Sequence, residues 1–415
     1  MRLLWLCNSA PGVVRTQITG KPAGAVNWVD HVLADLREQD VTLRILFRGQ
    51  PASGQMDDRC SYFGFGEHPA HQYPQELEAV FRQQIRSFQP DVIHSWGVEY
   101  GHTLAMVRAA QEEGMLPHMA ASIQGLCHYI SRHYAEGIPE KVQKRGTFRD
   151  VLRQDNICQQ QKKFAQRGDM EVQAIQTLPS VIGRTQWDRI CTELIHPQVS
   201  YYRCNETLRE EFYTDQWDYA ACRRHRIFAP GCEYPVKGFH YLLEAFALVR
   251  KRCPYATLAV PGADVRVRSG KERLRRGSYG AYLAKLMEQY GLGDRVEFLG
   301  SLSAEQMKQE FLQANVFVLP STVENSPNSL GEAMLLGLPC IASDVGGVSS
   351  LLENGSEGWL YPSTAPYVLA GQILEVFAKE ERAAEMGHKA RLRARQTHDP
   401  QTNLQTLLDI YRKLT

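Results

Sequence analysis

The stretch that decides the fold is VFVLPSTVENSPNSLGEAMLLGLPCIASDVGG, residues 316–347. It contains an apolar run at 316–320, a loop rich in Pro, Asn and Ser, a short helical segment, and a second apolar run at 340–343. This order predicts a strand, a loop, a crossover helix and a parallel strand. We expect Glu324 in the loop beyond the carboxyl end of the first strand, where ligands bind in doubly wound sheets.

The same alternation of short apolar runs and amphipathic segments fills most of the chain, which predicts the α/β class with parallel sheets covered on both faces. Helices are expected at 23–39 and 73–88. Strands are expected at 2–7, 41–47, 91–96, 118–124, 180–184 and 199–202 in the first half, and at 225–231, 256–262, 295–300, 316–320, 340–343 and 358–362 in the second.

The chain is too long for one ordinary core, so we expect two domains, at 1–220 and 221–395. Residues 396–415 are predicted to form a C-terminal helix that packs back towards the first domain. A polar stretch at 138–178 interrupts the strand rhythm and predicts an insertion of two or three solvated helices.

Composition restricts the class of protein and its partners. Hydrophobic residues make up 43% and charged residues 22%, as in a folded globular protein. The net charge of +1 gives no global field for nucleic acid. The ten cysteines show no C-x-x-C pair or zinc-type spacing, so we expect reduced thiols. The first residues are too short for a signal sequence and no run approaches about 20 apolar residues, so we expect a cytoplasmic protein, with peripheral contact at the inner face of the membrane left open.

Two motifs in the second half suggest an anion site. Asn328 and Ser329 precede an apolar helical run, and backbone N–H groups at such a helix start can meet a phosphate. Ser329 and Glu332 also match a capping box, which is a purely structural alternative. Lys237 and Gly238 lie just before an amphipathic helix; the lysine is a cation suited to phosphate, or simply a solvated residue.

The combination of these motifs resembles the retaining glycosyltransferases of family 4. The matching features are Lys237-Gly238, then Glu324 and Glu332 separated by seven residues and followed by Ala-Met, then Gly337, Pro339 and DVGG at 344–347. The resemblance is specific over 225–365 and one of layout in the first half. It implies the GT-B fold, in which two Rossmann-like doubly wound parallel-sheet domains face an interdomain cleft, the first binding the acceptor and the second a nucleotide sugar.

The resemblance also implies residue roles. Glu332 would hold the ribose hydroxyls, and Glu324 would face the donor sugar. Ser329 and Leu330 would offer backbone amides to the diphosphate, and Lys237 would neutralise charge on it as it departs. Backbone groups near 298–300 would recognise the base. The chain has no D-x-D sequence, so neither a metal nor a cofactor is expected, the nucleotide sugar being a co-substrate. The donor-binding residues are then Gly24, Lys237, Gly262, Leu299, Asn328, Ser329, Leu330 and Glu332.

Three positions depart from the family pattern. Gly231 is followed by Cys232 where the family often has Arg, so that Lys237 acts alone or an arginine from elsewhere substitutes. Gln124 stands where the family often has a His-Gly pair after a strand, and we assign it to the catalytic residues with Glu324 and Lys237. Its neutral amide can hydrogen-bond a sugar but cannot act as acid or base. Ala23-Gly24 keeps one glycine of a Gly-Gly pair near the first helix.

Some residues of the first half are candidates for the acceptor side. His94 and Trp96 end an expected strand, and His128 follows Gln124 by four residues. Each can touch an acceptor, although a strand-end His or Trp is more often a packing residue. The basic run at 266–280 suggests an anionic acceptor, a membrane surface or a solvated loop.

The predicted function is therefore a metal-independent retaining glycosyltransferase. It would move a sugar from a nucleoside diphosphate donor, such as a UDP-sugar or GDP-sugar, to a hydroxyl of a glycan, lipid-linked or small-molecule acceptor, with polysaccharide biosynthesis as a setting. Two alternatives stay open: a catalytically silent nucleotide-sugar-binding subunit and a sugar-nucleotide epimerase of related fold. The sequence leaves the donor base, the sugar, the acceptor and the oligomeric state undetermined.

Overall fold

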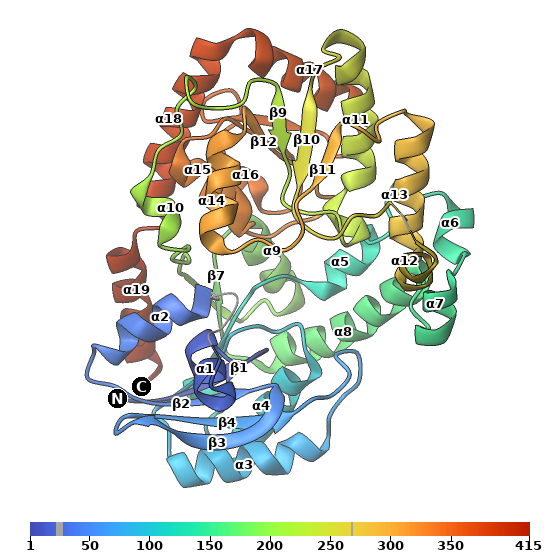
Figure 1. Cartoon of the computed structure of the whole chain (residues 1–415). Helices are drawn as coiled ribbons and strands as arrows, with labels where there is room; N and C mark the ends of the chain where they lie inside the picture. Colours follow the sequence, from blue (N-terminus) through green and yellow to red (C-terminus); the bar gives the residue numbers. More distant parts are fainter. Residues whose placement is uncertain (22–27, 267–268) are drawn as a thin grey trace. The chain divides into compact units, whose positions relative to one another are not determined.

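The computed structural model describes residues 1–21, 28–266 and 269–415, and its internal contacts divide the chain into two compact units (Figure 1). Unit 1 comprises Met1–Ser131, Lys163–Arg209 and His398–Thr415, and unit 2 comprises Arg132–Lys162 and Glu210–Thr397. Each unit is built on one sheet. No described helix has the length and apolar character that a bilayer crossing requires.

Unit 1 holds a sheet with the strand order β3-β4-β2-β1-β5-β6-β7-β8, in which all neighbours are parallel except the antiparallel pair of β3 and β4. Trp5 lies opposite Ile45 on one side and His94 on the other. The strands are β1 (Arg2–Cys7), β2 (Thr42–Phe47), β3 (Gly49–Asp57), β4 (Cys60–Gly66), β5 (Val92–Ser95), β6 (Met119–Ser122), β7 (Ser180–Gly183) and β8 (Ser200–Arg203).

Strand β1 shows why this sheet is covered on both faces. Side chains alternate along a strand, so Leu4 and Leu6 belong to one buried cluster while Leu3 and Trp5 belong to another. The C-terminal helix packs in the second cluster, where the Trp5 indole donates to the Tyr411 hydroxyl at 3.1 Å. The helices of unit 1 are α1 (Gly12–Thr19), α2 (Trp28–Arg37), α3 (Glu76–Phe88), α4 (Gly101–Glu112), η1 (Leu116–His118), α9 (Gln186–Ile195) and α19 (Pro400–Leu414); α5 (Cys127–His133) and α8 (Ile157–Thr177) contribute residues to both units.

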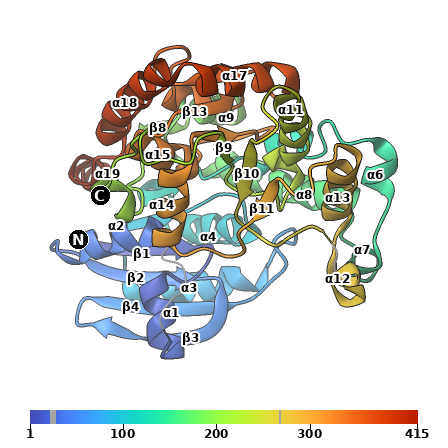
Figure 2. The ribbon, with the colours of Figure 1, turned by 45° about the horizontal axis from the view of Figure 1, so that its top comes forward.

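Unit 2 holds a fully parallel sheet with the order β11-β10-β9-β12-β13-β14. Its strands are short and mostly buried, as expected for apolar runs covered on both faces. Helices α11 and α17 pack against each other and lie side by side in Figure 2. The strands are β9 (Arg226–Phe228), β10 (Thr257–Val260), β11 (Val296–Phe298), β12 (Val316–Leu319), β13 (Cys340–Ser343) and β14 (Trp359–Tyr361).

The helices of unit 2 alternate with these strands, except for two that come from the inserted segment before β7. They are α6 (Glu140–Lys144), α7 (Phe148–Arg153), α10 (Glu211–Thr214), η2 (Pro235–Lys237), α11 (Phe239–Arg252), α12 (Gly270–Arg275), α13 (Ser278–Gln289), α14 (Ala304–Gln313), α15 (Asn328–Leu336), α16 (Val348–Leu351), α17 (Pro366–Ala378) and α18 (Glu380–Thr397).

The α/β class and all the expected strands are present. Two further strands, β3 and β4, were not expected. For β3 the reason is its sequence, GQPASGQMD, which is polar and Gly-containing and has no buried residue. Such a sequence is compatible with an edge strand, which needs no apolar face.

The borders of the units differ from the expected domain borders. The structure separates the units at 209/210 rather than near 220, and 132–162 joins unit 2 instead of the first half. One contact that joins 132–162 to unit 2 is made by a buried carboxylate, since Asp150 of α7 accepts the Ser278 backbone N–H at 2.8 Å. The expected insertion does contain three helices, yet it is not fully solvated, since Asp150 and Glu171 are buried.

Candidate functional site

The candidate site begins where the loops after β9 and β12 touch. Gly238 has φ +62°, and a Cβ built there would lie 1.8 Å from the Pro320 carbonyl oxygen. A side chain at this position would therefore both strain the backbone and collide with the neighbouring loop. The Thr322 backbone N–H donates to the Val236 carbonyl at 2.8 Å and holds the two loops together.

This close approach places Lys237 beside Glu324. The Lys237 ammonium donates to Glu324 Oε1 at 2.7 Å, and the Ser321 hydroxyl donates to the same oxygen at 2.7 Å. The Glu324 side chain is 14% exposed and the Lys237 side chain is 39% exposed. The carboxylate is thus fixed by two donors, while the cation stays accessible to a ligand.

The backbone of Glu324 is held from a third loop. Gly347 N–H donates to the Glu324 carbonyl at 3.0 Å. Gly346 has φ +52°, and a Cβ built there would lie 1.9 Å from that carbonyl oxygen. A side chain at position 346 would therefore collide with the Glu324 loop, so the close packing of the two loops requires glycine there.

The start of helix α15 does not have the expected capping box. The helix begins at Asn328, Pro327 occupies the N-cap position, and no side chain caps this end. Ser329 is already the second helical residue, so the Ser329-Glu332 capping box is wrong. Pro327 decides this outcome, because its φ of −70° suits the entry to a helix.

The first turn of α15 offers fewer backbone donors than expected. Leu330 N–H donates to the Pro327 carbonyl at 3.0 Å and Gly331 N–H to the same oxygen at 3.3 Å, so the expected availability of the Leu330 amide is corrected. Asn328 and Ser329 N–H groups make no hydrogen bond within the described part of the chain. These two donors, at the positive end of a helix dipole, suit an anion.

Glu332 lies one turn after Asn328, which puts the two residues on the same face of α15. Glu332 is 4% exposed. A ligand would therefore meet only a small part of this carboxylate, and its contact with ribose stays a prediction.

Gly262 and Leu299 follow neighbouring strands at the same edge of the sheet. Gly262 and Gly300 exchange backbone hydrogen bonds of 2.8 and 3.1 Å, and Leu299 N–H donates to the Val260 carbonyl at 2.9 Å. Because β11, β10, β9 and β12 are adjacent and parallel, the loops that carry Leu299, Gly262, Lys237 and Glu324 emerge in that order along one edge.

Cys232 and Gly24 were also expected to lie at the donor site. Cys232, at the place of the usual arginine, is 3% exposed, and burial raises the pKa of its thiol to about 12, so it supplies no charge to the site. Gly24 lies outside the described residues.

In unit 1, Gln124 belongs to a buried polar cluster. Its amide nitrogen donates to Glu206 Oε1 at 3.0 Å and its amide oxygen accepts from the Arg184 guanidinium at 3.2 Å. Arg184 and Glu206 form an ion pair with side chains that are 6% and 8% exposed. Gln124 thus completes the hydrogen bonding of a buried pair, and its part in catalysis stays a prediction.

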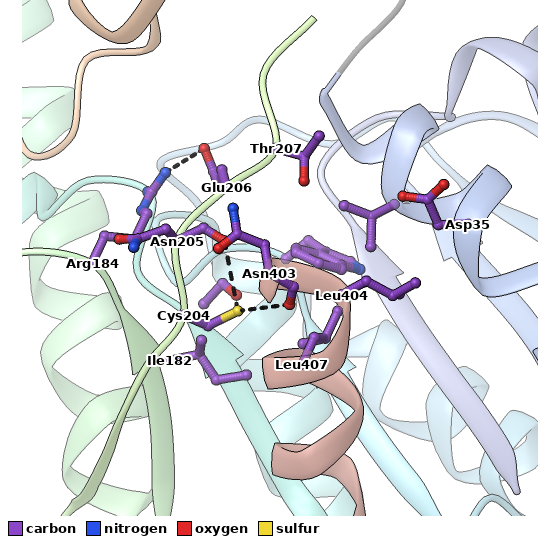
Figure 3. Close-up of a pocket in the computed structure, with 13 residues that line it drawn as sticks. Asp35, Ile182, Arg184, Cys204, Asn205, Glu206, Thr207, Asn403, Leu404 and Leu407 are labelled. Atoms are coloured by element: carbon purple, nitrogen blue, oxygen red, sulfur yellow. Dashed lines mark hydrogen bonds and ion pairs between the residues drawn. The ribbon is translucent and has the colours of Figure 1, made fainter. Parts of the chain in front are cut away.

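A small cavity of about 30 Å³ adjoins this pair, which is room for one or two waters. Figure 3 shows Arg184 and Glu206 at one side of this cavity. Cys204, which follows β8, and Asn403 of α19 also line the cavity. Its size excludes a sugar.

His94, a candidate for the acceptor side, is fully buried. Its two ring nitrogens lie 2.7 Å from the Tyr411 hydroxyl and 2.8 Å from the Ser122 hydroxyl. Trp96 is 7% exposed and packs on the His94 ring at 4.1 Å. These contacts fit the packing alternative for both residues, while His128 uses its backbone N–H to bond Glu171 at 3.0 Å.

The burial of His94 predicts a pH dependence of stability. Burial lowers the pKa of His94 from 6.5 to about 3. Between those values the unfolded chain binds a proton that the folded chain refuses, so acidification should lower the free energy of unfolding by about 1.4 kcal/mol per pH unit. Urea unfolding at pH 7 and pH 5 should show a smaller loss for His94→Gln than for the wild type. His388→Gln, at an exposed position, is the control; equal losses for His94→Gln and the wild type would refute the assignment.

Comparison with known proteins shows what the chain is similar to. Residues 226–393 match the family model described as glycosyl transferases group 1. One relative of the chain is WcaL of Salmonella typhimurium, named as a putative colanic acid biosynthesis glycosyltransferase, which is 34% identical over 24% of this chain and 26% of that protein. Another is the D-inositol 3-phosphate glycosyltransferase of Gordonia bronchialis, 31% identical over 39% of this chain and 34% of that protein.

The chain thus spans only about a quarter to a third of the length of these relatives. Solved structures extend the likeness to the whole fold. Sucrose-phosphate synthase from Thermosynechococcus elongatus superposes with a TM-score of 0.73 at 17% identity, over 100% of this chain and 99% of that one. HepE of Anabaena, solved with UDP and glucose, gives 0.68 at 17% identity over 99% of both chains. The expected GT-B class, with two Rossmann-like units, is confirmed.

Two residues of the candidate site were not expected from the sequence. Ser321 and Lys237 both donate to the Glu324 carboxylate. In the sequence, this contact is indicated only by the position of Ser321 three residues before Glu324. Gly346 was noticed as part of DVGG, but its contact with the Glu324 carbonyl depends on a loop fold that the sequence does not display.

Proposed function

We propose that this chain is a retaining glycosyltransferase that takes a sugar from a nucleoside diphosphate donor. The observation that carries the proposal is the Lys237–Glu324 pair, 2.7 Å apart, on the sheet edge that also bears the start of α15. A fixed carboxylate, an accessible cation and two backbone donors are the groups that a sugar linked to a diphosphate requires.

The diphosphate would be held by the Lys237 ammonium and by the N–H groups of Asn328 and Ser329. Glu332 would bind the ribose from the second turn of the same helix. The carbonyl side of Leu299 and the backbone at Gly262 would face the base, since the Leu299 amide is already engaged. Apart from Gly24, the expected donor-binding residues would then all lie on unit 2.

The reaction would break the bond between the anomeric carbon and the diphosphate oxygen and form a bond from that carbon to the acceptor oxygen on the same face. The acceptor proton would pass to the departing diphosphate oxygen. Negative charge grows on the leaving group, and Lys237 with the α15 amides would stabilise it. Glu324, anchored by Ser321, would orient the sugar and stabilise positive charge at the anomeric carbon. In this scheme Lys237 does the work of a metal ion.

The relatives support the choice of co-substrates. HepE has been solved with UDP and with UDP-glucose, so uridine diphosphate sugars are the first donors to test, followed by guanosine diphosphate sugars. The name of WcaL supports an acceptor from polysaccharide biosynthesis, free or lipid-linked.

Product analysis by NMR tests the proposal against its alternatives. We expect a glycoside with the anomeric configuration of the donor. An inverted product would refute retention, and a donor converted to its epimer without release of the diphosphate would identify an epimerase. Ligand-induced stabilisation of about 2.7 kcal/mol at a hundredfold excess over Kd, with no product from any donor, would identify a silent binding subunit.

A substitution at Ser329 isolates the α15 amides. Ser329→Pro removes one N–H while a proline is tolerated in the first turn of a helix. We expect about tenfold weaker binding of the nucleoside diphosphate, because one hydrogen bond to a charged group is lost. Ser329→Ala keeps the N–H and should bind like the wild type. Isothermal titration that finds both variants equal would remove the amide from the site.

A further inference from the structure

Helix α7 of unit 2 carries its apolar residues on the outside. Phe148, Val151 and Leu152 are 61%, 71% and 69% exposed. Their spacing places them on one face of the helix. In a surface helix of a globular protein such a face normally turns to the core. The arrangement in α7 is the reverse, so these side chains are available to something outside the unit.

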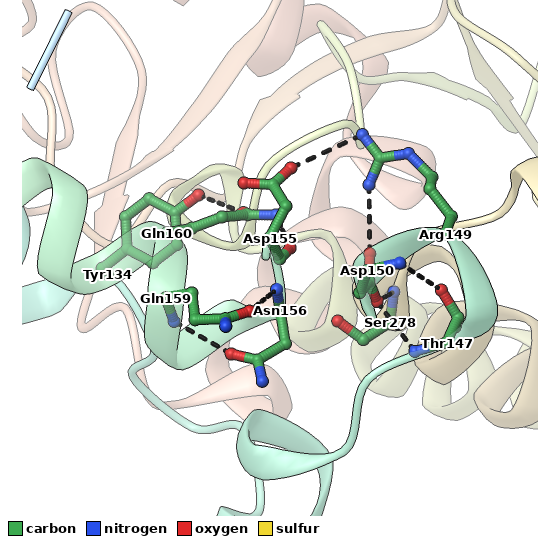
Figure 4. A network of polar contacts seen from close by, with 9 residues as sticks. All are labelled: Tyr134, Thr147, Arg149, Asp150, Asp155, Asn156, Gln159, Gln160 and Ser278. Atoms are coloured by element: carbon green, nitrogen blue, oxygen red, sulfur yellow. Dashed lines mark hydrogen bonds and ion pairs between the residues drawn. The ribbon is translucent and has the colours of Figure 1, made fainter. Parts of the chain in front are cut away.

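The outward orientation is fixed by the opposite face of α7. Asp150 is 1% exposed and accepts the backbone N–H groups of Ser278 at 2.8 Å and Thr147 at 3.0 Å (Figure 4). Arg149 donates to Asp150 at 3.1 Å and pairs with Asp155 at 3.5 Å. Turning the apolar face inward would break the contact between Asp150 and Ser278, which is the one that ties this face of α7 to a distant part of unit 2.

Helix α12 lies beside α7 in both Figure 1 and Figure 2, and the two helices are in contact. Leu274 of α12 is 53% exposed. Gly277, which follows α12, lies close to α7: a Cβ built there would be 3.2 Å from the Arg149 guanidinium. The exposed apolar residues of the two helices therefore belong to one region.

Positive charge is concentrated around these apolar residues. Segment 140–155 contains five basic and three acidic residues, and Arg275 and Arg276 directly follow Leu274. Lys141, Arg145, Arg153 and Arg275 are exposed, and none of the four has an ion-pair partner among the residues that the structure describes. We call the exposed apolar residues of α7 and α12 and these four basic residues the apolar-basic patch.

We propose that the apolar-basic patch docks the protein on an anionic membrane surface. Phe148, Val151, Leu152 and Leu274 enter the boundary between headgroups and acyl chains, and the surrounding cations bind anionic headgroups. A second copy of this chain is a poorer occupant, because pairing the patch with itself would bring two strongly positive surfaces together. The proposal does not depend on sugar transfer.

Vesicle flotation with the full chain tests this proposal. The probes are vesicles of phosphatidylcholine alone and vesicles with phosphatidylglycerol. We expect at least tenfold stronger binding to the anionic vesicles, and loss of that preference at high salt. The triple variant Phe148→Ser, Val151→Ser, Leu152→Ser should lower anionic-vesicle binding at least tenfold, and so should Arg145→Glu with Arg153→Glu.

Tyr367→Ser is the matched control, since Tyr367 is 69% exposed on α17 of the same unit, and it should bind vesicles like the wild type. Thermal unfolding of every variant shows whether it is folded. Equal binding to neutral and anionic vesicles would overturn the proposal, as would unchanged binding of the folded triple and charge-reversal variants. A patch-dependent dimer in sedimentation, with no vesicle binding, would also overturn it. Because binding is read without any donor, a failure here is distinguishable from a failure of the proposed transferase activity.

Discussion

Replacing Lys237 by Ala is expected to lower kcat by about 10²- to 10³-fold, the usual loss when one group that stabilises developing negative charge is removed. The ammonium is 2.7 Å from Glu324 and 39% exposed, so it can reach a diphosphate without leaving its loop. Lys237→Arg keeps the positive charge but replaces the compact ammonium by a larger, planar guanidinium, so it should recover only part of the rate. Steady-state kinetics with the preferred donor provides the measurement.

The same substitution should hardly change stability. Surface ion pairs contribute about 0–1 kcal/mol, and Lys237 is a partly exposed partner. Lys389→Ala, which breaks the 2.7 Å pair of Lys389 with Glu385 on α18, is the matched control and should affect neither rate nor stability much. A Lys237→Ala enzyme with wild-type kcat would remove the lysine from the mechanism, and an unfolded variant would show that its role is structural.

Gly238→Ala is expected to destabilise the protein strongly. A left-handed backbone costs a non-glycine residue about 1–2 kcal/mol, and the added methyl carbon would also meet the Pro320 carbonyl at 1.8 Å. Together these effects should lower the free energy of unfolding by roughly 3 kcal/mol. They should also lower the rate at least tenfold, since the loops that hold Lys237 and Glu324 would separate.

A substitution at a second glycine separates the cost of the left-handed backbone from the cost of the collision with Pro320. Gly291 has φ +63°, nearly that of Gly238, but nothing lies within 4 Å of a Cβ built there. Gly291→Ala should therefore show the backbone cost alone, about 1–2 kcal/mol, with wild-type turnover. Denaturant unfolding that gives the two variants equal losses would contradict the close approach of Gly238 to Pro320.

Much of the fold could be predicted from the sequence because its strands are buried on both faces. VFVL at 316–319 and CIAS at 340–343 are continuous buried runs, which need no knowledge of neighbours to be recognised. Strand β3 is the opposite case: it lies at a sheet edge, buries no residue, and leaves no apolar signal. The border of unit 2 was missed for a related reason, since the contact between Asp150 and Ser278 joins residues 128 positions apart.

In the candidate site too, local motifs could be predicted from the sequence, whereas contacts between distant segments could not. Lys237 and Glu324 were named from their motifs, and the structure brings them into contact across 87 positions. The start of α15 was misread, because Ser329 and Glu332 have capping-box spacing while Pro327 already sets the helix entry. The polar partners of Gln124 were unpredictable, since Arg184 and Glu206 come from distant loops and their pairing depends on the finished fold of unit 1.

The release of nucleoside diphosphate from a panel of UDP-sugars and GDP-sugars, with and without glycan and lipid-linked acceptors, tests the central claim most directly. We predict release with at least one donor that increases when an acceptor is added and falls about 10²- to 10³-fold in Lys237→Ala. No release with any donor and acceptor, from a protein that is folded by thermal unfolding, would contradict the assignment of Lys237 and Glu324 to sugar transfer.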